Sequence, residues 1–255
     1  MLMQKPLGQT LDEARLMVDI AEKAGIGLAV NQNARYCPAC YAVKQLLAPE
    51  RLGQPGILEI KNIVNSGYGL KLGPGGMIVE WGIHHADLLR WWADSAPVSV
   101  HASMKHKACV IAYEFENGVV ASQIEVTAIA PKSETPIRAW TERGSIVANH
   151  RWNPWGLGSW STEEVHFCLA NQPAGGGFFT MALPGEAPWK IGDKPVYDYC
   201  APIGGFIGVM GEFMQAISQG RAAPTNGRDN LLSLQMYMAA LRSAETGAAV
   251  DPRGL

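Results

Sequence analysis

An acid, an imidazole and a second acid recur at helical spacing in the segment 75–91. Glu80, His84 and Asp87 are three or four residues apart, so a helix through this segment would carry them on one face. The ordinary pKa of a histidine side chain is about 6.5, which suits proton transfer near neutral pH. A carboxylate one turn away can orient the ring. The segment therefore predicts an acid/base site on a helix.

Two other interpretations of this face stay open. The acids could be solvated at the start of a helix, with the histidine packed inside as an ordinary core residue. The same residue types also serve as metal ligands. However, the adjacent His84 and His85 point about 100° apart around a helix, so they cannot share one helical face. We therefore expect no metal site, and a structural role for His85.

The elements that must position this face begin at the N-terminus. Thr10 and Glu13 form a capping box ahead of an amphipathic helix that ends near Gly25. The apolar run 26–30 follows at once and is typical of strands in parallel sheets buried on both faces. A loop, a helix and a buried strand together predict one step of a doubly wound α/β fold.

From residue 98 onward the pattern changes to antiparallel strands. The runs 109–115 and 119–126 alternate around Asn117-Gly118, a strong hairpin signal, and 137–141 and 145–149 form a second pair. For residues 35–255 we expect a large, mostly antiparallel, open-faced sheet with helices on one side, so the fold class is α/β (α+β). The other expected elements are a helix at 38–47, a strand at 57–64, a glycine-rich loop at 66–76, loops through 150–200, and helices at 209–218 and 230–246.

The composition excludes several classes of partner. A net charge of -2 gives no attraction to nucleic acid or anionic membranes, and no apolar run approaches the roughly 20 residues that span a bilayer. Five cysteines is an odd number, which favours reduced thiols and a cytoplasmic location. We expect no nucleic-acid partner and no membrane partner.

Two further motifs have competing interpretations. Cys37 and Cys40 form a C-x-x-C that could be a redox pair, although ordinary positions at a helix start explain it equally. Tryptophans in the loop-rich region could stack on sugar rings, or could cover a sheet or a subunit contact. These are Trp152, Trp155 and Trp160.

Three anchors occur in a specific order. The first is Gln-Lys-Pro-Leu at 4–7, followed by a helix, a strand and Asn-x-x-x-Arg-Tyr at 31–36. The second is Glu-x-Gly-x-His-x-x-Asp at 80–87, and the third is a Gly-Arg-Asp turn at 227–229 before the last helix. Together they resemble the glucose–fructose oxidoreductase/inositol dehydrogenase (Gfo/Idh/MocA) family over nearly the whole chain. Gln4 stands where the family has glutamate, and Glu80 stands where it usually has aspartate.

The resemblance implies an NAD(P)-dependent oxidoreductase of a sugar, polyol or related secondary alcohol. It implies His84 as the general acid/base and Lys5 as the cation beside nicotinamide and substrate. Glu80 would orient the imidazole or bind a hydroxyl, and Asp87 would support His84 from the other side. It also implies a homo-oligomer that pairs through the open face of the sheet. The positions expected to contact the cofactor, NAD or NADP, are Lys5, Pro6, Asn31 and Arg35.

One family feature has no counterpart in this sequence. No Gly-x-Gly-x-x-Gly phosphate loop occurs, so the resemblance implies that residues 1–34 are the C-terminal remnant of a Rossmann domain and that residues 35–255 form the substrate and oligomerisation domain. We expect such a chain not to bind a dinucleotide tightly, and it could be inactive alone. A non-catalytic sugar-binding or assembly domain is the alternative, and an elimination or hydrolysis through transient oxidation is a third.

Overall fold

The computed structural model describes residues 1–64, 81–105, 107–127, 135–150, 165–170, 179–181, 190–191, 194–195 and 201–255. Within these ranges the largest element is an eight-stranded sheet in the order β10-β9-β8-β7-β3-β6-β5-β4. All of its neighbours are antiparallel except β3 and β6, which run parallel in the middle. Its strands are β3 (Pro55–Val64), β4 (Pro97–Lys105), β5 (Ala108–Phe115), β6 (Val120–Thr127), β7 (Thr135–Thr141), β8 (Gly144–His150), β9 (Val165–Leu169) and β10 (Phe179–Met181).

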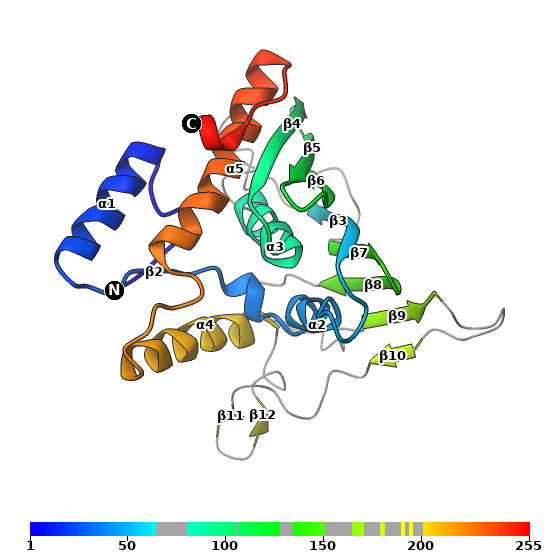
Figure 1. Cartoon of the computed structure of the whole chain (residues 1–255), viewed down its shortest axis with the longest axis horizontal. Helices are drawn as coiled ribbons and strands as arrows, with labels where there is room; N and C mark the ends of the chain where they lie inside the picture. Colours follow the sequence, from blue (N-terminus) through cyan, green and yellow to red (C-terminus); the bar gives the residue numbers. More distant parts are fainter. Residues whose placement is uncertain are drawn as a thin grey trace.

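Four helices contact this sheet from one face, on its left in Figure 1: α2 (Pro38–Leu46), α3 (Ile83–Ala93), α5 (Gly227–Thr246) and η5 (Pro252–Gly254). The helices η1 (Asn33–Tyr36) and α4 (Ala201–Ser218) pack on each other and on α2. Along β5, buried and exposed residues alternate, because successive side chains point to opposite faces of a strand. The inward residues, including Ile111 and Tyr113, join the main core beneath α3. The expected open-faced sheet with helices on one side is confirmed.

The local turn and cap signals are also confirmed. Thr10 caps α1 (Leu11–Lys23) through a capping box with Glu13. The hairpin between β5 and β6 turns at Asn117 and Gly118, and Gly118 has a φ of 84°, which favours glycine. The pair β7 and β8 also forms, but its turn lies one residue earlier than expected, at Glu142 and Arg143, and Gly144 already pairs with Thr141.

A separate parallel pair, β1 (Leu2–Met3) and β2 (Ala29–Val30), lies beside α1 at the left of Figure 1. The expected strand at 26–30 was too long, because Ile26 is 51% exposed and only the last two residues pair. We did not expect β1, whose two residues are too few to show a periodicity. The chain continues from β2 into η1, another element absent from the expected pattern.

The region 150–200, which we expected to be rich in loops, also contributes short strands. Both β9 and β10 extend the large sheet, and β11 (Lys190–Ile191) pairs with β12 (Lys194–Pro195). The glycine-rich loop at 66–76 and Trp152, Trp155, Trp160 and Trp189 lie outside the described residues. In the described ranges, none of the helices combines the length and the apolar character needed to cross a membrane.

Candidate active site

Polar side chains gather where β1 and β2 end. Gln4 and Lys5 follow β1, and Asn31 and Gln32 follow β2, so parallel pairing brings both exits to one edge. Ligands of open α/β sheets bind at such carboxyl edges. The Asn31 side-chain amide donates to Gln4 Oε1 at 3.3 Å, which joins the two exits. Lys5, partly buried, enters a cis peptide bond with Pro6.

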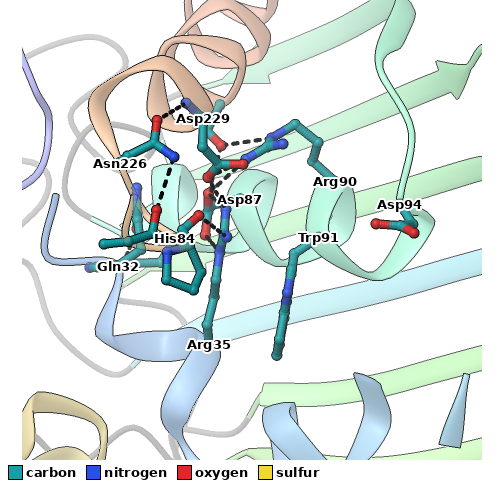
Figure 2. A network of polar contacts seen from close by, with 12 residues as sticks. Gln32, Arg35, His84, Asp87, Arg90, Trp91, Asp94, Asn226 and Asp229 are labelled. Carbon is teal, nitrogen blue, oxygen red and sulfur yellow. Dashed lines mark hydrogen bonds and ion pairs between the residues drawn. The ribbon is translucent and has the colours of Figure 1, made fainter. Parts of the chain in front are cut away.

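His84 reaches this edge from the first turn of α3. Its Nδ1 lies 2.9 Å from Gln32 Oε1 (Figure 2), and its side chain is 4% exposed. In this orientation of the Gln32 amide the facing oxygen can only accept, so Nδ1 carries the proton, and a neutral ring then has its lone pair on Nε2. Gln32, which sequence reasoning did not single out, thus fixes the ring and its tautomer. The contact brings His84 to the strand exit beside Lys5.

Asp87 lies on the same helix but faces a different partner, Arg35 (Figure 2). Its two oxygens accept from Arg35 Nε and Nη2 at 2.6 Å each, and one of them also accepts from Ser233 Oγ at 2.6 Å. Asp229 lies 2.7 Å from Arg35 and 2.8 Å from Arg90. The cluster of Arg35, Asp87, Arg90 and Asp229 therefore balances two cations with two anions and joins η1, α3 and α5.

The charges of this cluster perturb both members of the central pair. Burial alone would raise the pKa of the Asp87 carboxyl, but the charge and hydrogen bonds of Arg35, with Arg90 and Ser233, hold that pKa below its ordinary value. Burial lowers the pKa of Arg35, and Asp87 and Asp229 more than offset this, so the net direction is upward. Both side chains therefore stay ionised over the whole physiological range.

These positions differ from two expectations. Arg35 was expected beside the cofactor, yet Nε and Nη2 bond to carboxylates, Nη1 donates to the Pro224 carbonyl at 3.3 Å, and the side chain is 2% exposed. Asp87 was expected to support His84, yet its oxygens are directed to Arg35 and Ser233. A buried guanidinium requires a carboxylate partner, and this requirement decides where both side chains point. Glu80 lies outside the described residues.

His85 faces the sheet, as the helical rotation predicts. Its Nδ1 lies 2.6 Å from Glu125 Oε1 on β6, and both side chains are buried. The cysteines of the C-x-x-C are fully buried, Cys37 as the N-cap of α2 and Cys40 within it. Their places are ordinary helix positions.

Several amides at the strand edge contain buried polar atoms that no described group satisfies. They are Asn31 Oδ1, Gln32 Nε2 and Asn33 Nδ2, on residues at most 5% exposed. Buried polar atoms in proteins normally have partners, so unsatisfied ones require an explanation, such as a bound water, an ion or a polar ligand. The donor and acceptor types fit a carboxamide or a hydroxylated molecule. The run of amides after an apolar strand was the sequence signal for this edge.

This chain is similar in sequence to known proteins. Residues 41–147 match the family model described as the GFO/IDH/MocA C-terminal domain. A 1,5-anhydro-D-fructose reductase of Ensifer adhaerens is 25% identical over 98% of this chain and 72% of its own length.

Two solved structures share the fold. An oxidoreductase from Agrobacterium radiobacter in complex with NAD+, L-tartaric acid and magnesium has a TM-score of 0.80 at 21% identity, over 99% of this chain and 73% of that one. Levoglucosan dehydrogenase in complex with NADH and L-sorbose has a TM-score of 0.81 at 19% identity, over 98% of this chain and 72% of that one. The chain thus spans about three quarters of these proteins.

Proposed function

We propose that this chain, whose residues 41–147 match the GFO/IDH/MocA C-terminal domain, belongs to that family and serves the nicotinamide-dependent oxidation of a secondary alcohol on a sugar or polyol, with His84 as the proton acceptor. The observation that carries the proposal is the contact between His84 Nδ1 and Gln32 Oε1 at 2.9 Å. It holds a proton-exchanging group at the edge where the Lys5 and Asn31 segments end. The names of the relatives, which are sugar reductases and dehydrogenases, support the substrate class.

The chain's own residues divide the reaction between them. A bound nicotinamide would supply the acceptor for the hydride of the carbinol carbon, so that loss of hydride and hydroxyl proton together would leave a C=O bond. The hydroxyl proton goes to the lone pair on His84 Nε2, and Gln32 orients the ring while accepting from Nδ1. The Lys5 ammonium stabilises the negative charge that develops on the carbinol oxygen. In reduction the same proton returns from His84.

We further propose which residues contact the cofactor. Asn31 fits the nicotinamide end, because its buried Oδ1 has no described partner and could accept from a carboxamide. Lys5 and Pro6 precede it on the neighbouring strand exit. Arg35 serves this edge as a scaffold, since its donors bond to Asp87, Asp229 and Pro224.

The test measures turnover with a panel of sugars and polyols, including 1,5-anhydro sugars, at millimolar NAD+ or NADP+. We expect His84→Ala and Lys5→Ala each to lower kcat by about 10²–10⁴-fold without changing the circular dichroism spectrum. His101→Ala, at an exposed position on β4, is the matched control and should keep full activity. Near-normal turnover in both active-site variants would contradict the assignment.

Cofactor affinity gives a separate readout. Residues 1–255 contain no Gly-x-Gly-x-x-Gly, so we propose that these residues alone hold the dinucleotide weakly and that residues 1–34 act as part of a larger nucleotide-binding unit. Calorimetry with NADH should give no measurable heat at micromolar concentrations. A micromolar dissociation constant would overturn this proposal without affecting the role of His84.

A second candidate role is assembly through the outer face of the sheet. Five large apolar side chains on five strands are each 41–49% exposed there, and soluble proteins seldom leave such a surface open. We propose that two copies pair through this face. The residues are Ile57, Val110, Val120, Trp140 and Val147.

Light scattering after gel filtration tests the pairing. Val110→Lys should convert the dimer to a monomer, because a charge would be buried in the contact, whereas Lys23→Glu on exposed α1 should leave the mass unchanged. A monomeric wild-type chain at tens of micromolar would refute the pairing.

A further inference from the structure

The inner face of β6 carries polar residues where a covered sheet normally carries apolar ones. Gln123 is fully buried and Glu125 is 1% exposed, and both point toward α3. Burying an amide and a carboxylate costs free energy unless each is fully hydrogen-bonded. Their partners therefore show what the two residues are placed to hold.

Gln123 holds the start of α3. Its side-chain amide donates to the Gly82 carbonyl at 2.9 Å and to Glu125 Oε1 at 2.8 Å. The Tyr113 hydroxyl donates to Gln123 Oε1 at 2.7 Å, which fixes the orientation of the amide. Both amide hydrogens and the amide oxygen of Gln123 are thus in use.

Glu125 contacts the same turn at His85. Its Oε1 lies 2.6 Å from His85 Nδ1, and its Oε2 accepts from Asn62 Nδ2 at 2.7 Å. The Gln123 amide is a third donor to this carboxylate, beside His85 and Asn62. A glutamine at this position would bring its own N–H groups against these donors, so the contacts favour an acid over an amide here.

The two contact points on α3 lie on either side of His84. Gly82, at the N-cap position of α3, has no side chain with which to cap the first turn. Helix ends fray, and the bond from the Gln123 amide to the Gly82 carbonyl opposes this. We infer that Gln123 and Glu125 are positioning residues, which fix the first turn of α3 against β6 so that His84 keeps its hydrogen bond with Gln32. The significance of this for catalysis rests on the proposed function.

The test follows the His84 Nδ1 proton by NMR of histidine-labelled protein, with its signal identified by its loss in His84→Ala. We expect Gln123→Met, which fills similar space but cannot donate, to speed the exchange of this proton with water by about tenfold or more. Ile111→Val is the matched control, because it removes a buried methylene from neighbouring β5 and leaves the hydrogen bonds of Gln123 and Glu125 in place. It should leave the exchange rate within about twofold of the wild type.

A second variant covers the case in which Gln123→Met does not fold. Tyr113→Phe only frees the Gln123 amide to rotate, and we expect a smaller acceleration in the same direction. Unchanged exchange in whichever of the two variants folds would overturn the inference.

Turnover separates this inference from the proposed function. If His84→Ala keeps normal turnover, the proposed function fails, while accelerated exchange in Gln123→Met would still establish the positioning. If both hold, Gln123→Met should lower kcat with little change in KM, because the proton acceptor is displaced and the substrate contacts are not.

Discussion

Replacing Asp87 with asparagine should remove the charge balance of the buried cluster while keeping its shape. The carboxylate faces Arg35 through two bonds of 2.6 Å and lies 3.6 Å from Arg90. After the change, two guanidinium groups share the single charge of Asp229, which is 22% exposed. The asparagine would also direct an N–H group toward one of the donors that Asp87 accepted. An uncompensated cation would then remain inside the protein.

The magnitude follows from this geometry. Removing one partner of a buried ion pair costs about 3–5 kcal/mol, and the remaining contacts of Asp229 favour the lower end, about 3 kcal/mol. For a domain of this size the urea dependence of the free energy of unfolding is about 2–3 kcal/mol per molar. The midpoint of urea unfolding, followed by circular dichroism, should therefore fall by about 1–1.5 M.

Two further variants separate lost charge from lost packing. Arg228→Gln breaks an exposed pair with Glu22 and should leave the midpoint unchanged. The double variant Arg35→Met/Asp87→Leu removes both charges and should recover most of the loss, because apolar residues of similar size can replace a buried pair. A midpoint for Asp87→Asn within about 0.2 M of the wild type would refute the charge-balance argument.

Three other predictions follow from single contacts. The folded pKa of Asp87 lies below its unfolded value of about 3.9, so the stabilisation that its carboxylate gives the fold is complete above that pH and is lost as pH falls through the folded pKa. The acid-unfolding curve of Asp87→Asn should therefore be flatter than that of the wild type below about pH 4, and parallel curves would contradict this. Thr10→Ala should cost about 1 kcal/mol in thermal unfolding through loss of the cap on Glu13, and no change in Tm would show the cap to be idle. Gly144→Ala should lower the yield of folded protein severely, because its Cβ would lie 2.0 Å from the Cys168 carbonyl oxygen; normal yield and Tm would refute that packing.

The sequence predicted the features that depend on neighbours in the chain. The capping box at Thr10, the turn at Asn117-Gly118 and the alternation along β5 and β6 are local, and each is confirmed. Short strands were missed because they depend on pairing with a distant segment of the chain. Leu2–Met3 is defined by its pairing with Ala29–Val30, and two residues carry no pattern of their own.

In the site, too, the local features were predicted and the partners distant in the sequence were not. The spacing of His84 and His85 predicted that their rings face different directions, and they do. Their partners could not be found in this way, because Gln32 is 52 positions from His84 and Glu125 is 40 positions from His85. Arg35 and Asp87 were each assigned to chemistry because a charged residue in a motif does not reveal that another charge, 52 positions away, neutralises it. A polar residue at an inward strand position, such as Gln123, was the available signal.

The central place of β3 has a consequence for how the chain is made. Its two neighbours, β6 and β7, are both synthesised later, and β6 ends about sixty residues after β3, so at about 5–20 residues per second the strand waits roughly 3–12 s with both edges open. An unpaired edge of this kind attracts other chains during synthesis, and charged side chains are a usual protection. Glu59 and Lys61, on the outward face of β3, supply opposite charges 3.2 Å apart. They would keep the nascent strand soluble until its partners emerge.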